Sequence, residues 1–288
     1  MITPTASAGD VAVPTLFVLA FGAIIGSFLS MLVYRLPLVL KRQWEQDCRE
    51  TLGLAAQPAA RFNLAWPASH CPTCQAPLRF RDNVPIIGFL LLRGRCRHCR
   101  APIPIRYLAI EILTMLAAWA TLARFGITVA GLLAFALTAA LIALSFIDAR
   151  EQILPDVITL PFLWLGLLAN IAGLYAPLAQ AVLGAACAYG LLWLVFQIFR
   201  LATGKEGMGY GDFKLFALAG AWLGWPLLPL VLLLGALLGA LFGVVNLARG
   251  HMSRETPMPF GPFLCFATWV GLFFGKALMA GYLRAVHG

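Results

Sequence analysis

The chain has 288 residues, of which 61% are hydrophobic and only 11% are charged, and its formal net charge is +9. Its mean hydropathy of +0.86 excludes an ordinary soluble domain, in which roughly a quarter of the residues are charged. The composition therefore indicates an integral membrane protein.

Eight apolar runs suggest membrane helices, since crossing the hydrocarbon core takes about 20 residues. They cover residues 12–34, 105–123, 127–147, 157–176, 180–199, 213–225, 227–247 and 260–282. The sixth run is short and rich in Gly and Trp, so seven helices are also compatible with the sequence. The alternating pattern of a β-barrel is absent, and we expect an all-α, polytopic helical bundle.

The basic residues predict the orientation of these helices. No Lys or Arg precedes the first run, whereas a cleaved signal peptide needs a basic start, so we expect this run to remain as a helix. Of the 21 Lys and Arg residues, 18 lie in alternate loops. Because such loops face the cytoplasm, the large loop, Asp148 and Asp212 are expected there. The charge follows the loops instead of one folded face, so nucleic acid is not an expected partner.

The polar stretch between the first two runs predicts a small separate domain. We divide the chain into a first transmembrane helix (1–35), a cytoplasmic loop domain (36–104) and a transmembrane bundle (105–288). The loop contains "CPTC" and "CRHC", two CxxC pairs separated by 21 residues. This spacing is typical of a structural zinc site with four thiolate ligands. The predicted ligands are Cys71, Cys74, Cys96 and Cys99.

Other interpretations of the cysteines are less favoured. A disulfide or a redox pair is unexpected in the reducing compartment predicted for the loop. His70 and His98 flank the pairs and are read as neighbours of the site more readily than as ligands. The isolated cysteines at positions 48, 187 and 265 are expected to be buried or inert thiols.

Two aspartates stand where apolar runs begin or end. Asp148 closes the third run in "LSFIDAREQILPD", and Asp212 opens the sixth in "GMGYGDFK". Two carboxylates from different helices can hydrolyse a peptide, one activating water and the other polarising the carbonyl. Helix dipoles favour a negative charge at a helix start, so Asp212 is the expected base and Asp148 the expected acid. Asp156 follows eight residues after Asp148.

The glycine-rich loop before Asp212 admits more than one interpretation. Gly207, Gly209 and Gly211 permit positive φ and a close approach of an extended peptide. A phosphate-binding loop is disfavoured because the G-x-x-x-x-G-K-[ST] pattern is absent. Catalysis, a proton or ion pathway, and a purely structural helix cap all remain open from the residues alone.

Two further charged residues lie inside apolar runs. Glu111, in "RYLAIEIL", is expected to face the bundle interior and pair with Arg106, one turn away. Lys276, in the last run, is expected to extend its charge toward the interface or pair internally.

The motifs together resemble a known family. "GYGD" matches the GxGD signature of intramembrane aspartyl proteases. With "GSFLSMLVYRLP", the paired CxxC motifs, "RYLAIE", "IDAREQILPD" and "PFGPF" in order, the chain resembles type IV prepilin peptidase, a bifunctional leader peptidase and N-methyltransferase.

The resemblance implies specific roles for these residues. Asp148 and Asp212 would be the catalytic pair. It implies cleavage of prepilin and pseudopilin leaders after a glycine, at the cytoplasmic face of the inner membrane, in type IV pilus and type II secretion systems. The new N-terminal residue, usually Phe, would then be methylated from S-adenosylmethionine. Residues expected to support the site are Asp156, Gly209, Gly211, Lys214 and Glu111.

The sequence departs from the family at two motifs. Ser30 replaces a common Asn in "GSFLN", and "RYLAIE" lacks the proline of "RYPLVE". The sequence contains no Rossmann-type glycine motif that would indicate a site for the methyl donor. The candidates for the methyltransferase site are therefore Gly26, Arg35 and the cysteine loop. Acidic loop residues could meet the basic leader, namely Glu45, Asp47, Glu50 and Asp82. The rival hypotheses are a transporter or proton channel, and a non-catalytic scaffold with the loop as its binding module.

Overall fold

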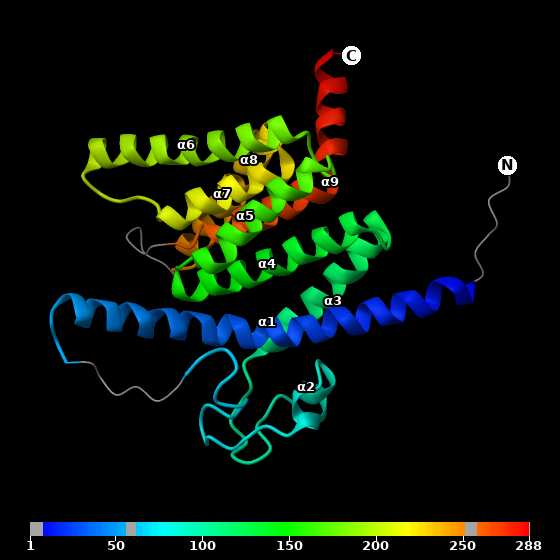
Figure 1. Cartoon of the computed structure of the whole chain (residues 1–288), viewed down its shortest axis with the longest axis vertical. Coiled ribbons are helices and arrows are strands. Elements are labelled where there is room, and N and C mark those ends of the chain that lie inside the picture. Colours follow the sequence, from blue (N-terminus) through cyan, green and yellow to red (C-terminus); the bar gives the residue numbers. More distant parts are fainter. Residues whose placement is uncertain (1–7, 56–61, 251–257, 288) are drawn as a thin grey trace. The chain divides into compact units, whose positions relative to one another are not determined.

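The computed structural model describes residues 8–55, 62–250 and 258–287, and within these ranges the regular secondary structure is helical (Figure 1). The only extended pairings there are isolated β-bridges, without a sheet. The eight apolar helices are α1 (Ala8–Thr51), α3 (Ile105–Phe125), α4 (Val129–Glu151), α5 (Asp156–Ile171), α6 (Leu178–Thr203), α7 (Tyr210–Leu223), α8 (Leu228–Ala248) and α9 (Gly261–His287). The shorter elements are η1 (Phe80–Asn83), α2 (Ile87–Leu91) and η2 (Trp225–Leu227).

The prediction of an all-helical, multi-pass membrane protein is confirmed. Among the described residues, six helices are long and apolar enough to cross a membrane: α1, α3, α4, α6, α8 and α9. Helices α5 and α7, with 16 and 14 residues, are shorter. At 1.5 Å per residue they reach about 24 and 21 Å, less than the hydrocarbon core of about 30 Å. Two of the eight expected runs are therefore helices shorter than a membrane span.

Helix α1 continues well beyond its apolar run. The run was expected to end at residue 34, but the helix continues to Thr51 through a charged segment. Gly53, with φ of 64°, lies just beyond the end of the helix, and the Leu54 N–H donates to the Arg49 carbonyl at 2.9 Å. A left-handed glycine of this kind is a common way to end a helix.

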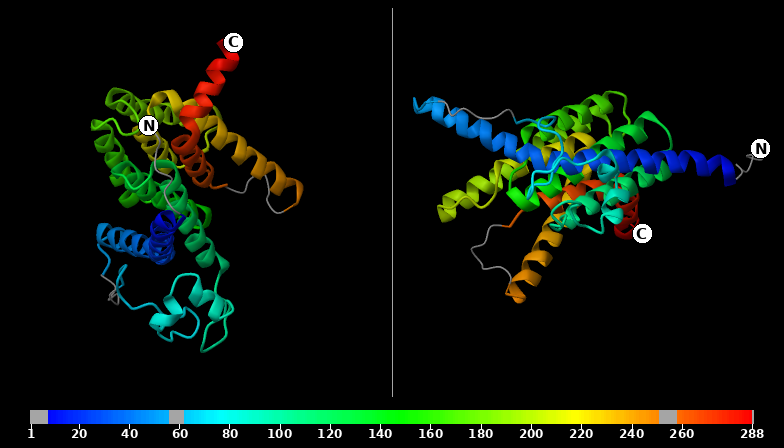
Figure 2. Two further views of the ribbon diagram at one scale, coloured as in Figure 1. Left: turned by 90° about the vertical axis from the view of Figure 1, so that its right-hand side faces the viewer. Right: turned by 90° about the horizontal axis from the view of Figure 1, so that it is seen from below.

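The chain divides into two compact units, an N-terminal unit (1–135) and a C-terminal unit (136–288), with the boundary inside α4. In the N-terminal unit α1 packs against α3. The loop that carries α2 lies at the N-terminal end of α3 (Figure 2). Phe21 of α1 packs against Phe135, with ring centroids 5.7 Å apart.

In the C-terminal unit α7 is the central helix. It packs against α5, α6 and α9, and every residue from Asp212 to Leu223 except Lys214 is buried. Contact with α6 is close because Gly184 faces Gly220: a Cβ added to Gly184 would lie 2.7 Å from the Gly220 carbonyl oxygen. Small residues of this kind let helices approach closely in membranes, where packing replaces the hydrophobic effect.

A buried amide joins α5 to α7. Asn170, which is 1% exposed, donates to the Ala221 carbonyl at 2.9 Å and also reaches that of Trp222. Its Oδ1 accepts from the backbone N–H groups of Tyr175 and Ala176, each at 3.0 Å. One side chain thus satisfies the C-terminal end of α7 and the turn that follows α5.

Replacing Asn170 with Ala is expected to destabilise the protein by at least about 2 kcal/mol, because it leaves several buried backbone groups unpaired. Thermal unfolding in nanodiscs would measure the effect. Asn246→Ala is the matched control, since Asn246 is half-buried and its side-chain amide makes an exposed hydrogen bond to the Phe242 carbonyl of its own helix. Equal unfolding temperatures for the two variants would contradict this account of α5 and α7.

Candidate active site and metal centre

Two buried carboxylates lie within electrostatic range of each other in the C-terminal unit. Asp148 lies in the last turn of α4 and Asp212 in the first turn of α7. Their exposed fractions are 6% and 8%. The fold thus brings together two aspartates that are 64 positions apart in the sequence.

Each aspartate lies beside a glycine that admits no side chain. The Gly261 N–H at the start of α9 donates to Asp148 Oδ2 at 3.0 Å, and a Cβ on Gly261 would stand 2.6 Å from that oxygen. A Cβ on Gly211 would lie 2.7 Å from Leu154, whose side chain also borders Gly261. Leu154 therefore occupies the space between the starts of α7 and α9.

One oxygen of the pair lacks a partner. Asp212 Oδ1 is buried and, across the described part of the chain, makes no hydrogen bond. Burying a carboxylate oxygen without a hydrogen-bond donor costs free energy. Such an unpaired oxygen is common in sites where a proton, a water molecule or a substrate completes the hydrogen bonds.

The glycine loop differs from the expectation in one respect. Neither Gly207, Gly209 nor Gly211 has positive φ; in this loop it is Gly204, at the end of α6, that does, with φ of 70°. The other glycines matter for space, because a Cβ on Gly207 would lie 2.7 Å from the ring of Phe199. Gly209 is exposed, and a Cβ there would meet only Asp212 Oδ2, at 3.6 Å.

Two of the supporting residues form an ion pair. Lys214 Nζ donates to both oxygens of Asp156, at 2.8 and 2.6 Å, and so links the start of α5 to α7. The pair is partly exposed, with side-chain exposures of 30% and 50%. This ion pair joins the starts of α5 and α7, and it is more exposed than Asp148 and Asp212.

Some neighbours of the aspartates were not singled out from the sequence. Cys265 of α9 is buried, shares a hydrogen bond with Ser145 of α4, and lies within electrostatic range of both carboxylates. Its burial agrees with the expectation of a buried or inert thiol, but the sequence does not place it near the aspartates. Leu154 lies inside a quoted motif, but an apolar residue in a short connection gives no signal of its own.

The four predicted cysteines converge in the N-terminal unit. Their Sγ atoms all lie within 4.8 Å of one another, with 3.8 Å between those of Cys71 and Cys99 and 3.9 Å between those of Cys74 and Cys96. Four Zn–S bonds of about 2.3 Å in a tetrahedron place the sulfurs about 3.8 Å apart. The donor set and spacing fit zinc.

The two cysteine pairs have the same backbone form. The residue after each pair, Gln75 or Arg100, has φ of 58°. The Cys71 N–H donates to the Ala76 carbonyl, and the Cys96 N–H to that of Ala101, both at 2.9 Å. The sequence repeat C-x-x-C-x-A-P thus builds the same turn twice.

The local charges favour a bound cation at this centre. Hydrogen bonds, of which the one from the backbone N–H of Cys74 has the largest effect, lower the pKa of the Cys71 thiol to about 6, although burial alone would raise it. A backbone hydrogen bond from Ala101 acts the same way on Cys99, but burial and the other three thiols raise the pKa of Cys99 to about 11. Crowded sulfurs therefore cannot all ionise unless a positive ion offsets their charges.

A partly exposed ion pair supports the second cysteine pair, with side-chain exposures of 45% for Arg97 and 4% for Asp82. Arg97 Nε donates to both oxygens of Asp82, at 3.1 and 3.2 Å, and these hydrogen bonds hold the pKa of Asp82 below its usual value. Asp82 thus pairs with Arg97, and its contact with a basic leader stays a prediction.

Glu111 has different partners from those expected. Its Oε2 accepts from the Ile86 N–H at 2.6 Å, and it shares a hydrogen bond with Ser27 of α1. Arg106 instead lies over the ring of Tyr107, 5.6 Å from its centroid. The expected Glu111–Arg106 pair is therefore wrong, because the loop backbone takes the place of the arginine.

Comparisons with known proteins agree with both units. Residues 20–125 match the bacterial peptidase A24 N-terminal domain, and residues 135–244 match the type IV leader peptidase family. A prepilin leader peptidase/N-methyltransferase of Pseudomonas putida is 48% identical over 267 residues, covering 91% of each chain. That of Pseudomonas aeruginosa is 46% identical over 275 residues, covering 94% of this chain and 95% of the relative.

A relative from another genus is similar to the same extent. The prepilin leader peptidase/N-methyltransferase of Aeromonas hydrophila is 46% identical over 275 residues, covering 92% of both chains. No solved structure matches the chain. These alignments include both units, and each unit has its own family match. The chain therefore belongs to the type IV leader peptidase family.

Proposed function

We propose that Asp148 and Asp212 are the catalytic pair of a prepilin leader peptidase, and that the same protein N-methylates the cleaved product. The observation that carries this proposal is the pair of buried carboxylates within electrostatic range, one of which has an oxygen without a hydrogen-bond partner. Family membership supports it through the relatives' names.

The proposed cleavage uses one shared proton. Two adjacent carboxylates do not both ionise, so one removes a proton from water while the other donates a proton to the carbonyl oxygen. The water oxygen bonds to the carbonyl carbon, and the tetrahedral species then breaks its C–N bond. The carboxyl that took the water proton passes it to the leaving amine, and the hydroxyl returns its proton to the other carboxylate. Helix dipoles favour the charge on Asp212, but the Gly261 N–H supports a charge on Asp148, so we assign the proton to the pair and not to one residue.

The surroundings suggest where the substrate lies. Gly209 is exposed beside Asp212, so an extended peptide could approach the carboxylates along the loop before α7. A basic leader on the cytoplasmic side and an apolar stem in the bilayer would bring the scissile bond, after a glycine, to this level of the inner membrane. The excess of basic residues in the loops supports this orientation.

The cysteine cluster is proposed to hold a structural zinc ion. Bound zinc would supply a charge that holds four thiolates together. The loop has short helices and a small core, and small domains of this kind commonly need a metal to remain folded. Methyl transfer would use S-adenosylmethionine, which supplies an electrophilic methyl group when bound. The division into first helix, loop domain and protease bundle remains part of this proposal.

Asp148→Asn and Asp212→Asn are each expected to lower the rate of leader cleavage by at least about 100-fold, because an amide can neither accept the water proton nor share one. Cleavage of a synthetic prepilin in nanodiscs, with the product identified by mass spectrometry, measures the rate. Glu206→Gln, an exposed acid in the same loop, is the matched control. Normal cleavage by either aspartate variant would refute the assigned pair.

Lys214→Met and Asp156→Asn are expected to slow cleavage only severalfold. Their ion pair is partly exposed, and such pairs contribute about 0.2–1 kcal/mol. A double-mutant cycle on the cleavage rate tests this, with coupling below about 1 kcal/mol as the expected result. Complete loss of cleavage in either single variant would show that the pair takes part in the chemistry directly.

The purified protein is expected to contain about one zinc ion per chain, and Cys96→Ser is expected to lower that content severalfold. Elemental analysis by mass spectrometry measures it. Cys48→Ser is the control, because Cys48 lies outside the cluster and is exposed. A metal-free protein whose mass is lower by two hydrogens for each cysteine pair would instead indicate disulfides.

A further inference from the structure

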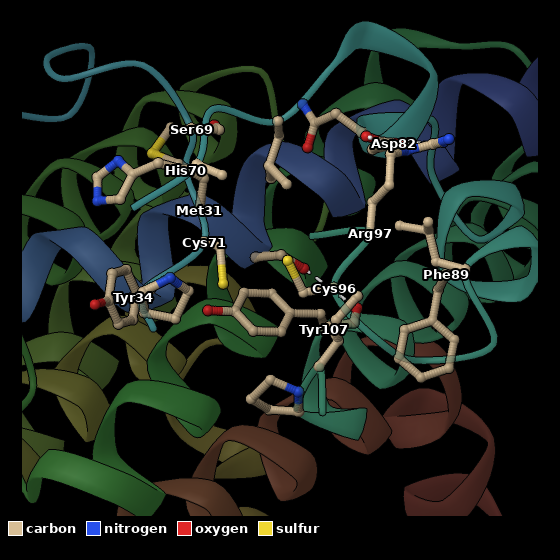
Figure 3. A pocket seen from close by; sticks show the side chains of 18 of the residues that line it. Met31, Tyr34, Ser69, His70, Cys71, Asp82, Phe89, Cys96, Arg97 and Tyr107 are labelled. Carbon is tan, nitrogen blue, oxygen red and sulfur yellow. Dashed lines mark hydrogen bonds and ion pairs between the residues drawn. The ribbon is translucent and has the colours of Figure 1, made fainter. Parts of the chain in front are cut away.

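A cavity of about 230 Å³ lies within the N-terminal unit, between α1, the cysteine loop and α3 (Figure 3). Met31 and Tyr34 line it from α1, and Tyr107 lines it from α3. The two buried ligands of the cysteine cluster, Cys71 and Cys96, form part of its wall. The proposed peptidase chemistry leaves this cavity without a role.

A buried guanidinium lines this cavity. Arg35 is 5% exposed, and its Nη1 donates to the Leu64 carbonyl at 3.1 Å and, more weakly, to that of Asn63. Within the described ranges no carboxylate forms an ion pair with Arg35. No buried nitrogen of Arg35 lacks a hydrogen bond. Arg35 lines the cavity, with its guanidinium carbon 5.9 Å from the centroid of the Phe62 ring. A buried cation that no carboxylate neutralises suits an anionic group, especially a carboxylate.

The same cavity also contains a carboxylate and aromatic surfaces. Glu111 is 9% exposed and lines the cavity while Ile86 and Ser27 hold it in place. The rings of Tyr34, Phe62 and Tyr107 line it as well, and Figure 3 shows the Tyr107 ring projecting into it. Aromatic faces attract both a flat base and a cationic sulfur.

We propose that this cavity binds the methyl donor, S-adenosylmethionine, with Arg35 holding its carboxylate and Glu111 facing its cationic groups. The proposal rests on the methyltransferase half of the proposed function. The donor carries a carboxylate, an ammonium, a sulfonium and a purine, and the lining supplies a partner for each. An extended basic leader fits less well, because the positive charge of Arg35 repels it. The cavity volume is closer to that of a site for a small molecule.

The transfer balances as a displacement. The neutral amine of the cleaved product attacks the methyl carbon; the N–C bond forms as the S–C bond breaks, and the sulfonium becomes a neutral thioether. The amine then loses a proton to water. Glu111, positioned by the loop and by α1, would stabilise the positive charge as it moves from sulfur to nitrogen.

Binding of methyl-labelled S-adenosylmethionine to the full chain in nanodiscs tests the proposal. Arg35→Gln is expected to raise the Kd at least tenfold, since a buried charge-assisted hydrogen bond contributes about this much. Arg35→Lys should retain part of the affinity because it keeps the charge. Arg49→Gln is the matched control, as Arg49 lies on the same helix outside the cavity and pairs with Glu45.

Zinc content, measured in the same samples, shows whether the loop remains folded. Wild-type affinity in a zinc-replete Arg35→Gln variant overturns the inference. If that variant loses its zinc, ultraviolet cross-linking of the labelled donor to the wild-type chain decides: attachment near Tyr34 or Tyr107 supports the cavity, and attachment only within residues 136–288 overturns it. Wild-type protein that cleaves a prepilin but binds no donor refutes this inference alone, whereas protein that does not cleave refutes the proposed function itself.

Discussion

Burying two carboxylates within electrostatic range of each other in an apolar bundle is the constraint on which the C-terminal unit depends. An isolated ionised carboxylate in such surroundings costs several kcal/mol, so the helices around it must supply donors and exclude alternatives. The Gly261 N–H donates to Asp148, while the starts of α7 and α9 leave room only for glycine near Leu154. The central position of α7 fixes Asp212, and the Asn170 amide in turn secures the other end of that helix.

The N-terminal unit depends on a different interaction, the convergence of four thiols. Its loop has little core of its own, and the two C-x-x-C-x-A-P turns form the wall of a cavity that α1 and α3 complete. Arg35 and Glu111 are buried there as opposite charges, each held by loop backbone groups. The proposed zinc ion would shape this cavity without touching the ligand's reactive atoms, because a closed four-sulfur site leaves no open coordination position.

The two units suggest how one chain can carry two activities. Each unit has its own family match and its own buried polar site. Peptide cleavage creates the amine that methylation consumes, so the reactions are ordered by their chemistry. Separate sites allow the dry, acidic environment of the aspartates to differ from the aromatic cavity proposed for the methyl donor.

The sequence by itself determined the helical membrane class, the cysteine set and the two aspartates, because apolar run length, CxxC spacing and the GxGD motif are local patterns. Tertiary structure alone decided the partners. Glu111 pairs with the loop backbone instead of Arg106, Gly261 donates to Asp148, and Asp156 meets Lys214. The glycines before Asp212 provide space and not positive φ. Such contacts join residues 25 to 113 positions apart, and no local pattern encodes them, because they arise only when helices pack and buried polar groups must find donors.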